Sequence, residues 1–374
     1  MPRRRILHVV YSFSIGGLEN VIVQLINRLP TNKYEHIVLS LTVISDFKNR
    51  VTQPNVQFIA LNKAPGHAVP LYPKIFKLLR QLRPDVIHTC NLGALEIMPI
   101  AWLAGIPLRI HVEHGLDAPD PNGTSTRYRI IRKLYKPFVS HFVAVSKPLD
   151  DYLANAIGIP NKHRSIIANG VDTDRFAPLI APRIAVSGCP FDPAQHWLAG
   201  TVGRLQSVKN QPFLARGFVR LIREHPEVAE RARLIIIGEG PLRAETERIL
   251  QEGNVAQYAW LPGARNDIAE ILGMLDCFVL PSQTEGTSCT LQEAMACGLP
   301  TIATAVGGTP ALVEEGITGQ LIEVNDDQAL AQALWKAYSQ PDILRIQGNT
   351  ARQRALSNFK LNTMIDSYDD IFSF

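Results

Sequence analysis

Apolar residues recur along this chain in two alternating rhythms. Short unbroken apolar runs predict buried strands, for example at Ile6–Tyr11 and Phe278–Leu280. Apolar residues spaced three or four positions apart predict helices, for example over Leu18–Leu29. Because strands and helices of this kind alternate over most of the chain, the pattern predicts an α/β protein with parallel, doubly wound sheets. Ligands of such sheets gather at the carboxyl ends of the strands.

The chain has 374 residues, which is long for one domain and sufficient for two. Periodicity fades in the proline-rich stretch Pro178–Pro193, which we interpret as the linker. The predicted domains are therefore 1–180 and 190–354. We expect the final helix, within 355–374, to cross back onto the first domain, although packing on the second domain also fits the sequence.

Composition narrows the class of protein. The chain is 46% hydrophobic, and its five cysteines show neither a C-x-x-C pair nor a metal-ligand spacing, which is typical of a reducing cytosol. The start, MPRRRILHVVYSF, is basic and then apolar, but the apolar run is short and no cleavage site follows it, so we interpret it as a strand. The most apolar stretch, Ala94–Leu108, contains Glu96 and is too short to span a bilayer.

Charge is distributed unevenly along the chain. Residues 1–180 contain 22 Lys and Arg but only 12 Asp and Glu, whereas the remaining residues contain 16 and 22. This basic first half predicts an anionic partner, either a lipid surface or a phosphate-bearing acceptor. No nucleic-acid-binding motif accompanies the charge, so we expect no nucleic-acid partner.

The segment Pro281–Gly308 carries the clearest chemical pattern. Ser288 is placed to cap a helix that Gly298 would end. Glu285 precedes this helix and Glu293 lies inside it, so the two carboxylates are roughly 10 Å apart. A pyrophosphate between them would meet the free N–H groups of the helix N-terminus. Two glutamates at this spacing are by themselves more typical of a solvated helix.

The sequence of this segment, EGTSCTLQEAMACGLPTIATAVGG, resembles the E-x7-E signature of retaining glycosyltransferases of the GT4 family. The resemblance covers nearly the whole chain. It implies a GT-B fold, in which two Rossmann-like domains face each other across a cleft, the first for the acceptor and the second for a nucleotide-sugar donor. It also implies that Glu285 binds the transferred sugar and Glu293 the ribose. The turn between them would complete the donor contacts through Gly286, Thr287 and Ser288.

A second pattern in this half is the pair of cations in VGRLQSVKN. Arg204 and Lys209 belong to a predicted strand-to-helix loop, where two cations can neutralise a pyrophosphate. Two exposed cations alone are more often solvated charges. The sequence VGRLQSVKN resembles the diphosphate clamp of the GT4 family. The resemblance also implies that the turn containing Gly238 lies beside the nucleobase.

In the first half, Gly16 and Gly17 lie between a predicted strand and a predicted helix, where glycine lets the backbone approach a phosphate. The sequence here does not match the dehydrogenase motif G-x-G-x-x-G. The motif G-G-x-E, Gly16 to Glu19, instead resembles the donor-facing loop of GT4 enzymes. His114 follows a predicted strand and resembles the active-site histidine of that family, which contacts the donor sugar. His111, inside the same strand, is the weaker candidate.

The stretch Arg127–Phe138 predicts a basic amphipathic helix. We assign Arg129, Arg132, Lys133 and Lys136 to one face and Ile130, Ile131, Leu134 and Phe138 to another. An ordinary surface helix that covers the sheet fits this pattern. A helix that lies on an anionic membrane surface beside the acceptor also fits it.

We expect neither a metal nor another cofactor besides the nucleotide-sugar co-substrate. Asp172 and Asp174 form a D-x-D pattern, which binds a metal ion in another glycosyltransferase fold. Here they lie in a turn whose sequence, NGVDTDRF, resembles the GT4 interdomain linker, so we do not interpret them as a metal site. The two cations and the helix N-terminus would stabilise the departing diphosphate instead. No carboxylate stands out as a nucleophile, so by analogy with the family we favour front-face displacement.

A narrower resemblance rests on VVYSFSIGGLENVIVQLINRLP, LRPDVIHTCNLGALE and RIHVEHG. These stretches are similar to sugar transferases of bacterial exopolysaccharide clusters associated with exosortase/PEP-CTERM sorting. The resemblance implies a cytoplasmic protein, peripheral at the inner face of the cytoplasmic membrane, that extends a polyprenyl-linked glycan. Two other classes remain open, a GT-B sugar-nucleotide epimerase and a nucleotide-sugar-binding protein without turnover.

Overall fold

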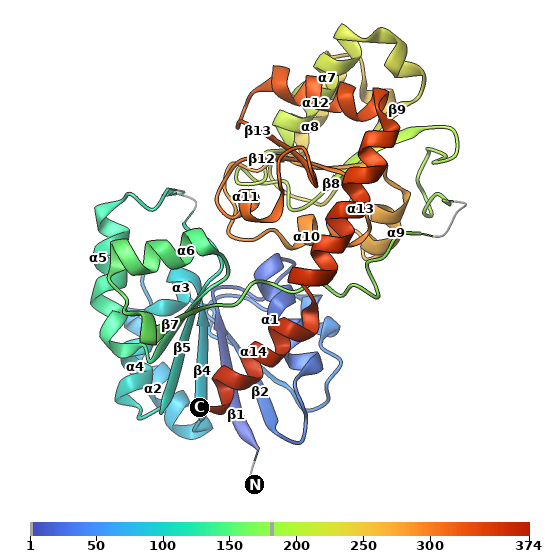
Figure 1. Ribbon diagram of the computed structural model, residues 1–374. Helices are drawn as coiled ribbons and strands as arrows, with labels where there is room; N and C mark the ends of the chain where they lie inside the picture. The colour runs from blue at the N-terminus through green and yellow to red at the C-terminus, as the bar shows by residue number, and fades with distance from the viewer. Residues whose placement is uncertain (1–2, 118, 121, 180–182) are drawn as a thin grey trace. The chain divides into compact units, whose positions relative to one another are not determined.

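The computed structural model describes residues 3–117, 119–120, 122–179 and 183–374, so the predicted domain end at residue 180 lies outside the described residues. The chain divides into two compact units (Figure 1). The first unit comprises Met1–Asn169 and Asn362–Phe374, and the second comprises Gly170–Leu361.

The two passages of the chain between the units pair with each other. Val171 forms a parallel β-bridge with Lys360, and the N–H of Leu361 donates to the carbonyl of Val171. The second unit therefore begins at Gly170, before the proline-rich stretch that we interpreted as the linker. Only the residues after Leu361 return to the first unit, rather than all of 355–374.

The first unit contains a seven-stranded parallel sheet in the order β3-β2-β1-β4-β5-β6-β7. The strands are β1 (Arg4–Val10), β2 (Tyr34–Ser40), β3 (Gln57–Ala60), β4 (Val86–Cys90), β5 (Leu108–Glu113), β6 (His141–Ala144) and β7 (Arg164–Ile166). The strand order reverses between β1 and β4, which is the topological switch point of a doubly wound sheet.

Helices cover both faces of this sheet. They are α1 (Gly17–Arg28), α2 (Tyr72–Leu82), α3 (Asn91–Leu95), α4 (Met98–Leu103), α5 (Thr126–Tyr135), α6 (Lys147–Asp151) and α14 (Leu361–Ser373). The shorter turns are η1 (Asp46–Arg50), η2 (Val69–Leu71), η3 (Lys136–Phe138), η4 (Tyr152–Ile157) and η5 (Asn161–His163). One core joins α2, α3 and α4 to the face that carries Leu7 and Ile87. The opposite face packs against α1 and against α14, which lies beside β1 (Figure 1).

The second unit contains a six-stranded parallel sheet in the order β10-β9-β8-β11-β12-β13. Its strands are β8 (Trp197–Val202), β9 (Ala232–Ile237), β10 (Ala259–Gly263), β11 (Cys277–Leu280), β12 (Thr301–Thr304) and β13 (Gly319–Ile322). The order reverses between β8 and β11. Two sheets of this kind confirm the predicted α/β, Rossmann-like fold class.

The second sheet is covered by α7 (Gln211–Glu224), α8 (Arg243–Glu252), α9 (Ile268–Met274), α10 (Cys289–Ala296), α11 (Thr309–Leu312), α12 (Asp327–Ser339) and α13 (Pro341–Asn358), with turns η6 (Pro226–Glu230) and η7 (Ala256–Tyr258). The apolar faces of α7 and α12 share one core with the strands, through residues such as Phe218 and Leu334. Among the described residues, none of the helices combines the length and apolar character that crossing a bilayer requires.

Three buried histidines contact one another on the face of the first sheet that α14 covers. His8 Nδ1 lies 2.9 Å from His88 Nδ1, and His8 Nε2 lies 3.1 Å from His36 Nδ1. The rings of Tyr368 and Phe372 on α14 cover this cluster. Burial lowers the pKa of all three imidazoles, of His36 to about 4 and of His88 to about 3, so they are neutral in the folded protein near pH 7.

We expect the free energy of unfolding to fall as the pH decreases from about 6.5 toward 4. In this range the histidines of the unfolded chain bind protons, whereas the buried histidines of the folded protein stay neutral. Each such histidine contributes about 1.4 kcal/mol per pH unit in this window. Urea unfolding at pH 7 and pH 5 measures the change, and His36→Phe should make it smaller. Equal stability at the two pH values would show that the cluster takes up protons without cost.

Candidate active site

The predicted donor residues gather at the switch point of the second sheet. Arg204 and Lys209 follow β8, and Glu285 follows the adjacent strand β11. Lys209 Nζ lies 2.5 Å from Glu285 Oε1, and Ser282 Oγ donates to the same oxygen at 2.6 Å. The structure therefore joins one predicted diphosphate cation directly to the carboxylate predicted to bind the sugar.

Arg204, the other predicted cation, is exposed. Its carbonyl accepts from Gln211 Nε2 at 3.1 Å, but within the described part of the chain its guanidinium forms neither a hydrogen bond nor an ion pair. A guanidinium without a partner, in the same loop as Lys209, is available to an incoming anion, which it can bind through two parallel N–H groups.

Gly238 shapes the loop that carries Arg204. Its φ is +138°, and a Cβ at this position would lie 2.0 Å from the Gly203 carbonyl oxygen. Only glycine lets the turn after β9 pack this closely against the loop after β8. The predicted contact between Gly238 and the donor remains a prediction, whereas its packing role is visible in the structure.

Glu285 is held by neighbours that the sequence did not indicate. Ser282, whose side chain is fully buried, receives at its own carbonyl a 2.6 Å hydrogen bond from Thr304 Oγ1. The N–H of Gly308 donates to the Glu285 carbonyl at 3.3 Å, and Gly307 is so close that a Cβ there would lie 1.8 Å from that oxygen. The S-x-x-E spacing between Ser282 and Glu285 was the available signal.

The helix that follows Glu285 forms as predicted. Ser288 is the N-cap of α10 and accepts from the N–H of Leu291 at 3.4 Å, and the chain leaves the helix at Gly298 with φ +75°. Glu293 lies half-buried in the second turn. The buried residues Gly286, Thr287 and Ser288 precede the helix, so its N-terminus begins at the carboxyl edge of the sheet.

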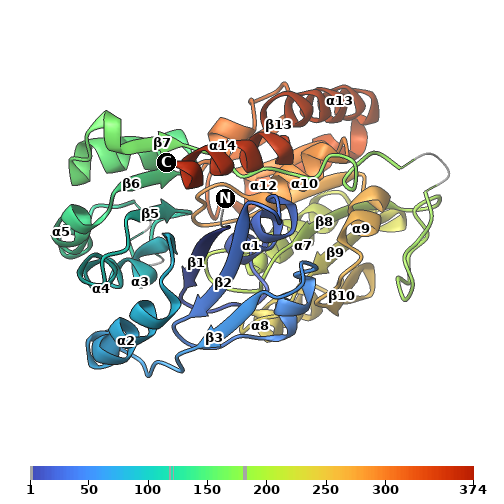
Figure 2. The same ribbon diagram turned by 90° about the horizontal axis from the view of Figure 1, so that it is seen from below.

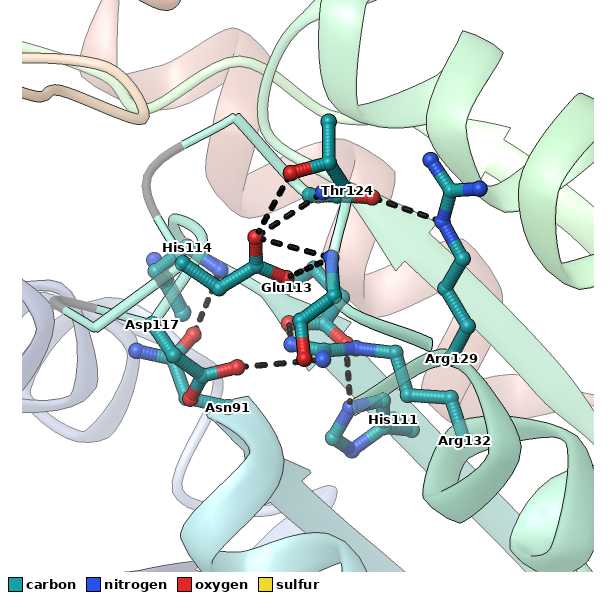
Figure 3. A network of polar contacts seen from close by, with 11 residues as sticks. Asn91, His111, Glu113, His114, Asp117, Thr124, Arg129 and Arg132 are labelled. Atoms are coloured by element: carbon teal, nitrogen blue, oxygen red, sulfur yellow. Dashed lines mark hydrogen bonds and ion pairs between the residues drawn. The ribbon is translucent and has the colours of Figure 1, made fainter. Parts of the chain in front are cut away.

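The first unit places its candidates at the corresponding edge of its own sheet. Gly16 is extended before α1, which Gly17 opens, and His114 directly follows β5. The N–H of His114 donates to Asn91 Oδ1 at 2.7 Å, and Asn91 itself follows β4 (Figure 3). These residues therefore lie at or beside the switch point between β1 and β4.

The ring nitrogens of His114 differ from those of His111 in their hydrogen bonding. Both ring nitrogens are buried, and neither has a hydrogen-bond partner among the described residues. Burial is the main cause that lowers the pKa of His114 to about 4, so near pH 7 the ring is neutral, with one donor and one acceptor. His111 instead lies inside β5, fully buried, with Nδ1 2.8 Å from Thr89 Oγ1.

The prediction that Arg132 belongs to a membrane-facing surface is wrong. Arg132 is only 1% exposed, and its guanidinium contacts Glu113 and Asp117. Arg129 and Lys136 are half-buried and donate to backbone carbonyls, Arg129 to that of Gly123. Of the four predicted basic contacts, only Lys133 is exposed.

The D-x-D pattern is part of a turn. Asp172 Oδ1 accepts from the N–H groups of Asp174 and Arg175 at 3.2 and 3.1 Å. In the described portion of the chain, no group of three or more His, Cys, Asp or Glu side chains is arranged to hold a metal ion.

Two family models match this chain, one in each half. The model of the Glycosyltransferase Family 4 domain matches residues 15–175, and that of the Glycosyl transferases group 1 domain matches residues 198–340. An Escherichia coli relative, UDP-Gal:alpha-D-GlcNAc-diphosphoundecaprenol alpha-1,3-galactosyltransferase, is 26% identical over 98% of this chain and 96% of its own.

Further relatives share the fold or part of the sequence. A GDP-mannose-dependent alpha-(1-6)-phosphatidylinositol monomannoside mannosyltransferase from Mycolicibacterium smegmatis is 30% identical over 59% of this chain and 58% of its own. HepE from Anabaena, solved in complex with UDP and glucose, is 20% identical and superposes with a TM-score of 0.82 over 99% of this chain and 100% of its own. With two matching domain models and two Rossmann-like sheets, the chain is a GT4-family glycosyltransferase of the GT-B type.

Proposed function

We propose that this enzyme transfers a sugar from a UDP- or GDP-sugar to a glycan on a polyprenyl-linked acceptor, with retention of anomeric configuration. The observation that carries the proposal is the contact between Lys209 and Glu285 at the switch point of the second sheet, with the exposed Arg204 in the same loop as Lys209. The names of two relatives support the donor classes, since one uses UDP-Gal and the other GDP-mannose. The name of the first also supports an undecaprenyl-linked acceptor.

The geometry supports a sequence of contacts on donor binding. Arg204 binds the diphosphate, and Lys209 exchanges the Glu285 carboxylate for a phosphate oxygen. Glu285 is then released to bind hydroxyls of the sugar, while Glu293 binds the ribose. The second unit thus holds the donor, and the first unit holds the acceptor.

The chemical step in this proposal is a front-face displacement. The bond between the anomeric carbon and the diphosphate oxygen breaks as the acceptor oxygen bonds to the same face of that carbon. The acceptor's proton passes to an oxygen of the leaving phosphate. Arg204, Lys209 and the N-terminus of α10 stabilise the charge that develops on the diphosphate, and His114 contacts the sugar, so the step needs no metal ion.

The biological setting is part of the same proposal. The first third of the chain is similar to sugar transferases of exopolysaccharide clusters associated with exosortase/PEP-CTERM sorting, which favours a role in bacterial exopolysaccharide biosynthesis. An acceptor on a polyprenyl carrier is held in the membrane, so the enzyme would work in the cytoplasm at the inner membrane face.

Thermal-shift screening of nucleoside diphosphates and their sugars tests the donor assignment, because a bound donor raises stability with its concentration relative to its Kd. UDP or GDP compounds should raise the melting temperature. Proton NMR spectroscopy of the stabilising donor, with and without a lipid-linked acceptor, then identifies the reaction. An epimer formed from donor alone would indicate an epimerase, and a bound but unchanged donor would indicate a protein without turnover.

A mixed apolar and basic surface, the α4–α5 face, supports peripheral membrane binding. We define it by the exposed residues Trp102, Leu103, Arg127, Ile130, Lys133 and Leu134. Helices α4 and α5 lie side by side in both views, and Trp102 stacks edge-on with Phe138 of η3 (Figure 1, Figure 2). Leu134 is 64% exposed and Ile130 is 59% exposed, so at least this part of the predicted apolar face of α5 does not cover the sheet. Exposed apolar residues beside cations are the composition of an interfacial helix.

We expect the protein to float with anionic vesicles at low salt and to be released at high salt, because Lys and Arg contribute about 1 kcal/mol each near an anionic surface. Changing Arg127, Ile130, Lys133 and Leu134 to Ser should reduce recovery. Ile343→Ser with Ile346→Ser, two exposed isoleucines on α13, is the matched control and should float like wild type. Equal recovery of wild type with neutral and anionic vesicles would contradict electrostatic membrane binding.

A further inference from the structure

The most deeply buried charge in the first unit lies directly before His114. Glu113, the last residue of β5, is 0% exposed, and Arg132 of α5 is 1% exposed. Arg132 Nε donates to Glu113 Oε1 at 2.7 Å, and Arg132 Nη2 donates to Oε2 at 3.3 Å (Figure 3). Burial alone raises the pKa of Glu113, but Arg132 and His111 outweigh it and hold this pKa at about 2, so the carboxyl stays ionised.

The same guanidinium also fixes the chain after His114. Arg132 Nη1 donates to Asp117 Oδ2 at 3.0 Å, so one side chain contacts the residue before His114 and another three residues after it. The N–H of His114 is bound separately by Asn91 Oδ1 at 2.7 Å. The backbone of His114 is thus fixed from both sides (Figure 3), while its ring nitrogens have no partner among the described residues.

Stability alone does not account for this arrangement. Removing two charges from water is costly, and a buried ion pair is often no more stabilising than apolar side chains of similar size. A bidentate Arg–carboxylate pair, in contrast, sets the geometry of the groups that carry it. The pair joins α5 to the end of β5, where His114 begins the loop.

We propose that Arg132, through its buried pair with Glu113 and its second contact with Asp117, is a positioning residue that fixes the His114 imidazole for its role in sugar transfer. This inference rests on the proposed function. It assigns to α5 an inward role in catalysis that is separate from the outward role of Lys133 on the α4–α5 face.

The decisive variant replaces both buried charges with apolar residues, as Glu113→Leu with Arg132→Met, so that neither charge is left unpaired. It should keep its melting temperature and its affinity for UDP or GDP, because the predicted diphosphate residues belong to the other unit. Its kcat for transfer should fall at least tenfold. Asp117→Asn, at a residue 23% exposed, removes the negative charge from only the outer contact and so weakens it; this variant should lower kcat less without unfolding the protein.

A control pair of the same residue types, Arg5 and Glu35, lies at the amino ends of strands in the same sheet, opposite the carboxyl ends where His114 lies. Arg5 makes two hydrogen bonds to Glu35 at 3.2 and 3.1 Å, at the amino ends of β1 and β2, so Arg5→Met with Glu35→Leu should leave kcat unchanged. Arg132→Lys with native Glu113 keeps the positive charge but cannot form the bidentate contact. We expect its kcat to lie between that of wild type and that of Arg132→Met alone.

The outcomes separate this inference from the proposed function. Absence of sugar transfer by wild type would overturn the proposed function. Transfer by wild type with unchanged kcat in both the double apolar variant and Asp117→Asn would overturn the positioning role. If the double variant does not fold, Arg132→Lys and Asp117→Asn decide the question by kcat at unchanged nucleotide affinity, and a wild-type kcat in both contradicts the inference.

Discussion

Replacing Glu285 with glutamine is expected to lower the kcat of sugar transfer by about 100-fold or more, the effect typical of losing one preorganised transition-state contact. The affinity for UDP or GDP should hold or rise, because the change weakens the 2.5 Å contact that occupies Lys209. Steady-state kinetics measure the loss of turnover, and calorimetric titration measures the affinity.

Glu293→Gln is the comparison for this experiment, because it changes the second carboxylate of the same segment. We assign Glu293 to the ribose, which is part of both product and donor, so this variant should bind nucleoside diphosphate and donor more weakly. If the Glu285 and Glu293 variants behaved alike, or if their effects were exchanged, the proposed orientation of the donor would be wrong.

Arg204→Ala is expected to weaken the binding of UDP or GDP at least tenfold, since a hydrogen bond to a charged group contributes about 1.5–3 kcal/mol. Lys209→Ala should also weaken binding, but by less than Arg204→Ala. The reason is that Lys209 must first give up Glu285, whereas the Arg204 guanidinium has no partner within the described residues. Calorimetric titration with UDP and GDP measures both effects.

Arg216→Ala is the control for these two variants. Arg216 belongs to the same unit but is paired with Asp327, with its Nε 3.1 Å from the carboxylate, so its loss should leave nucleotide affinity unchanged. Wild-type affinity in both Arg204→Ala and Lys209→Ala would remove the diphosphate site from the loop after β8.

Features encoded by short stretches of sequence could be predicted well. The strands and helices of both sheets follow from apolar runs and helical spacing, as at β1, β11 and α1. The cap at Ser288 and the end of α10 at Gly298 follow from local backbone chemistry. The position of His114 just after β5 follows from the alternation of side chains along the strand.

Features that depend on distant partners could not be predicted. The helical spacing of α5 gave Arg132 the same face as the exposed Lys133, and only Glu113, 19 residues earlier, explains why Arg132 turns inward. The boundary at Gly170 likewise depends on the pairing of Val171 with Lys360. The proline-rich composition that suggested a later boundary carries no information about that pairing.

The histidine cluster shows the same limit. His8, His36 and His88 lie in β1, β2 and β4, but the contacts between them depend on the strand order β2-β1-β4 and on the register that pairs His8 with His88. The sequence contains three histidines in apolar runs but does not indicate that their rings contact one another.

The most direct test of the account is to follow the reaction by proton NMR, with the donor selected by thermal shift, a polyprenyl-linked acceptor and a chelator present. We predict that the donor's anomeric signal disappears as free nucleoside diphosphate and a new glycoside appear, and that the new anomeric proton has the configuration of the donor. A glycoside of opposite configuration, or a donor that binds but is never consumed, would contradict the central claim that this chain is a retaining, metal-independent glycosyltransferase.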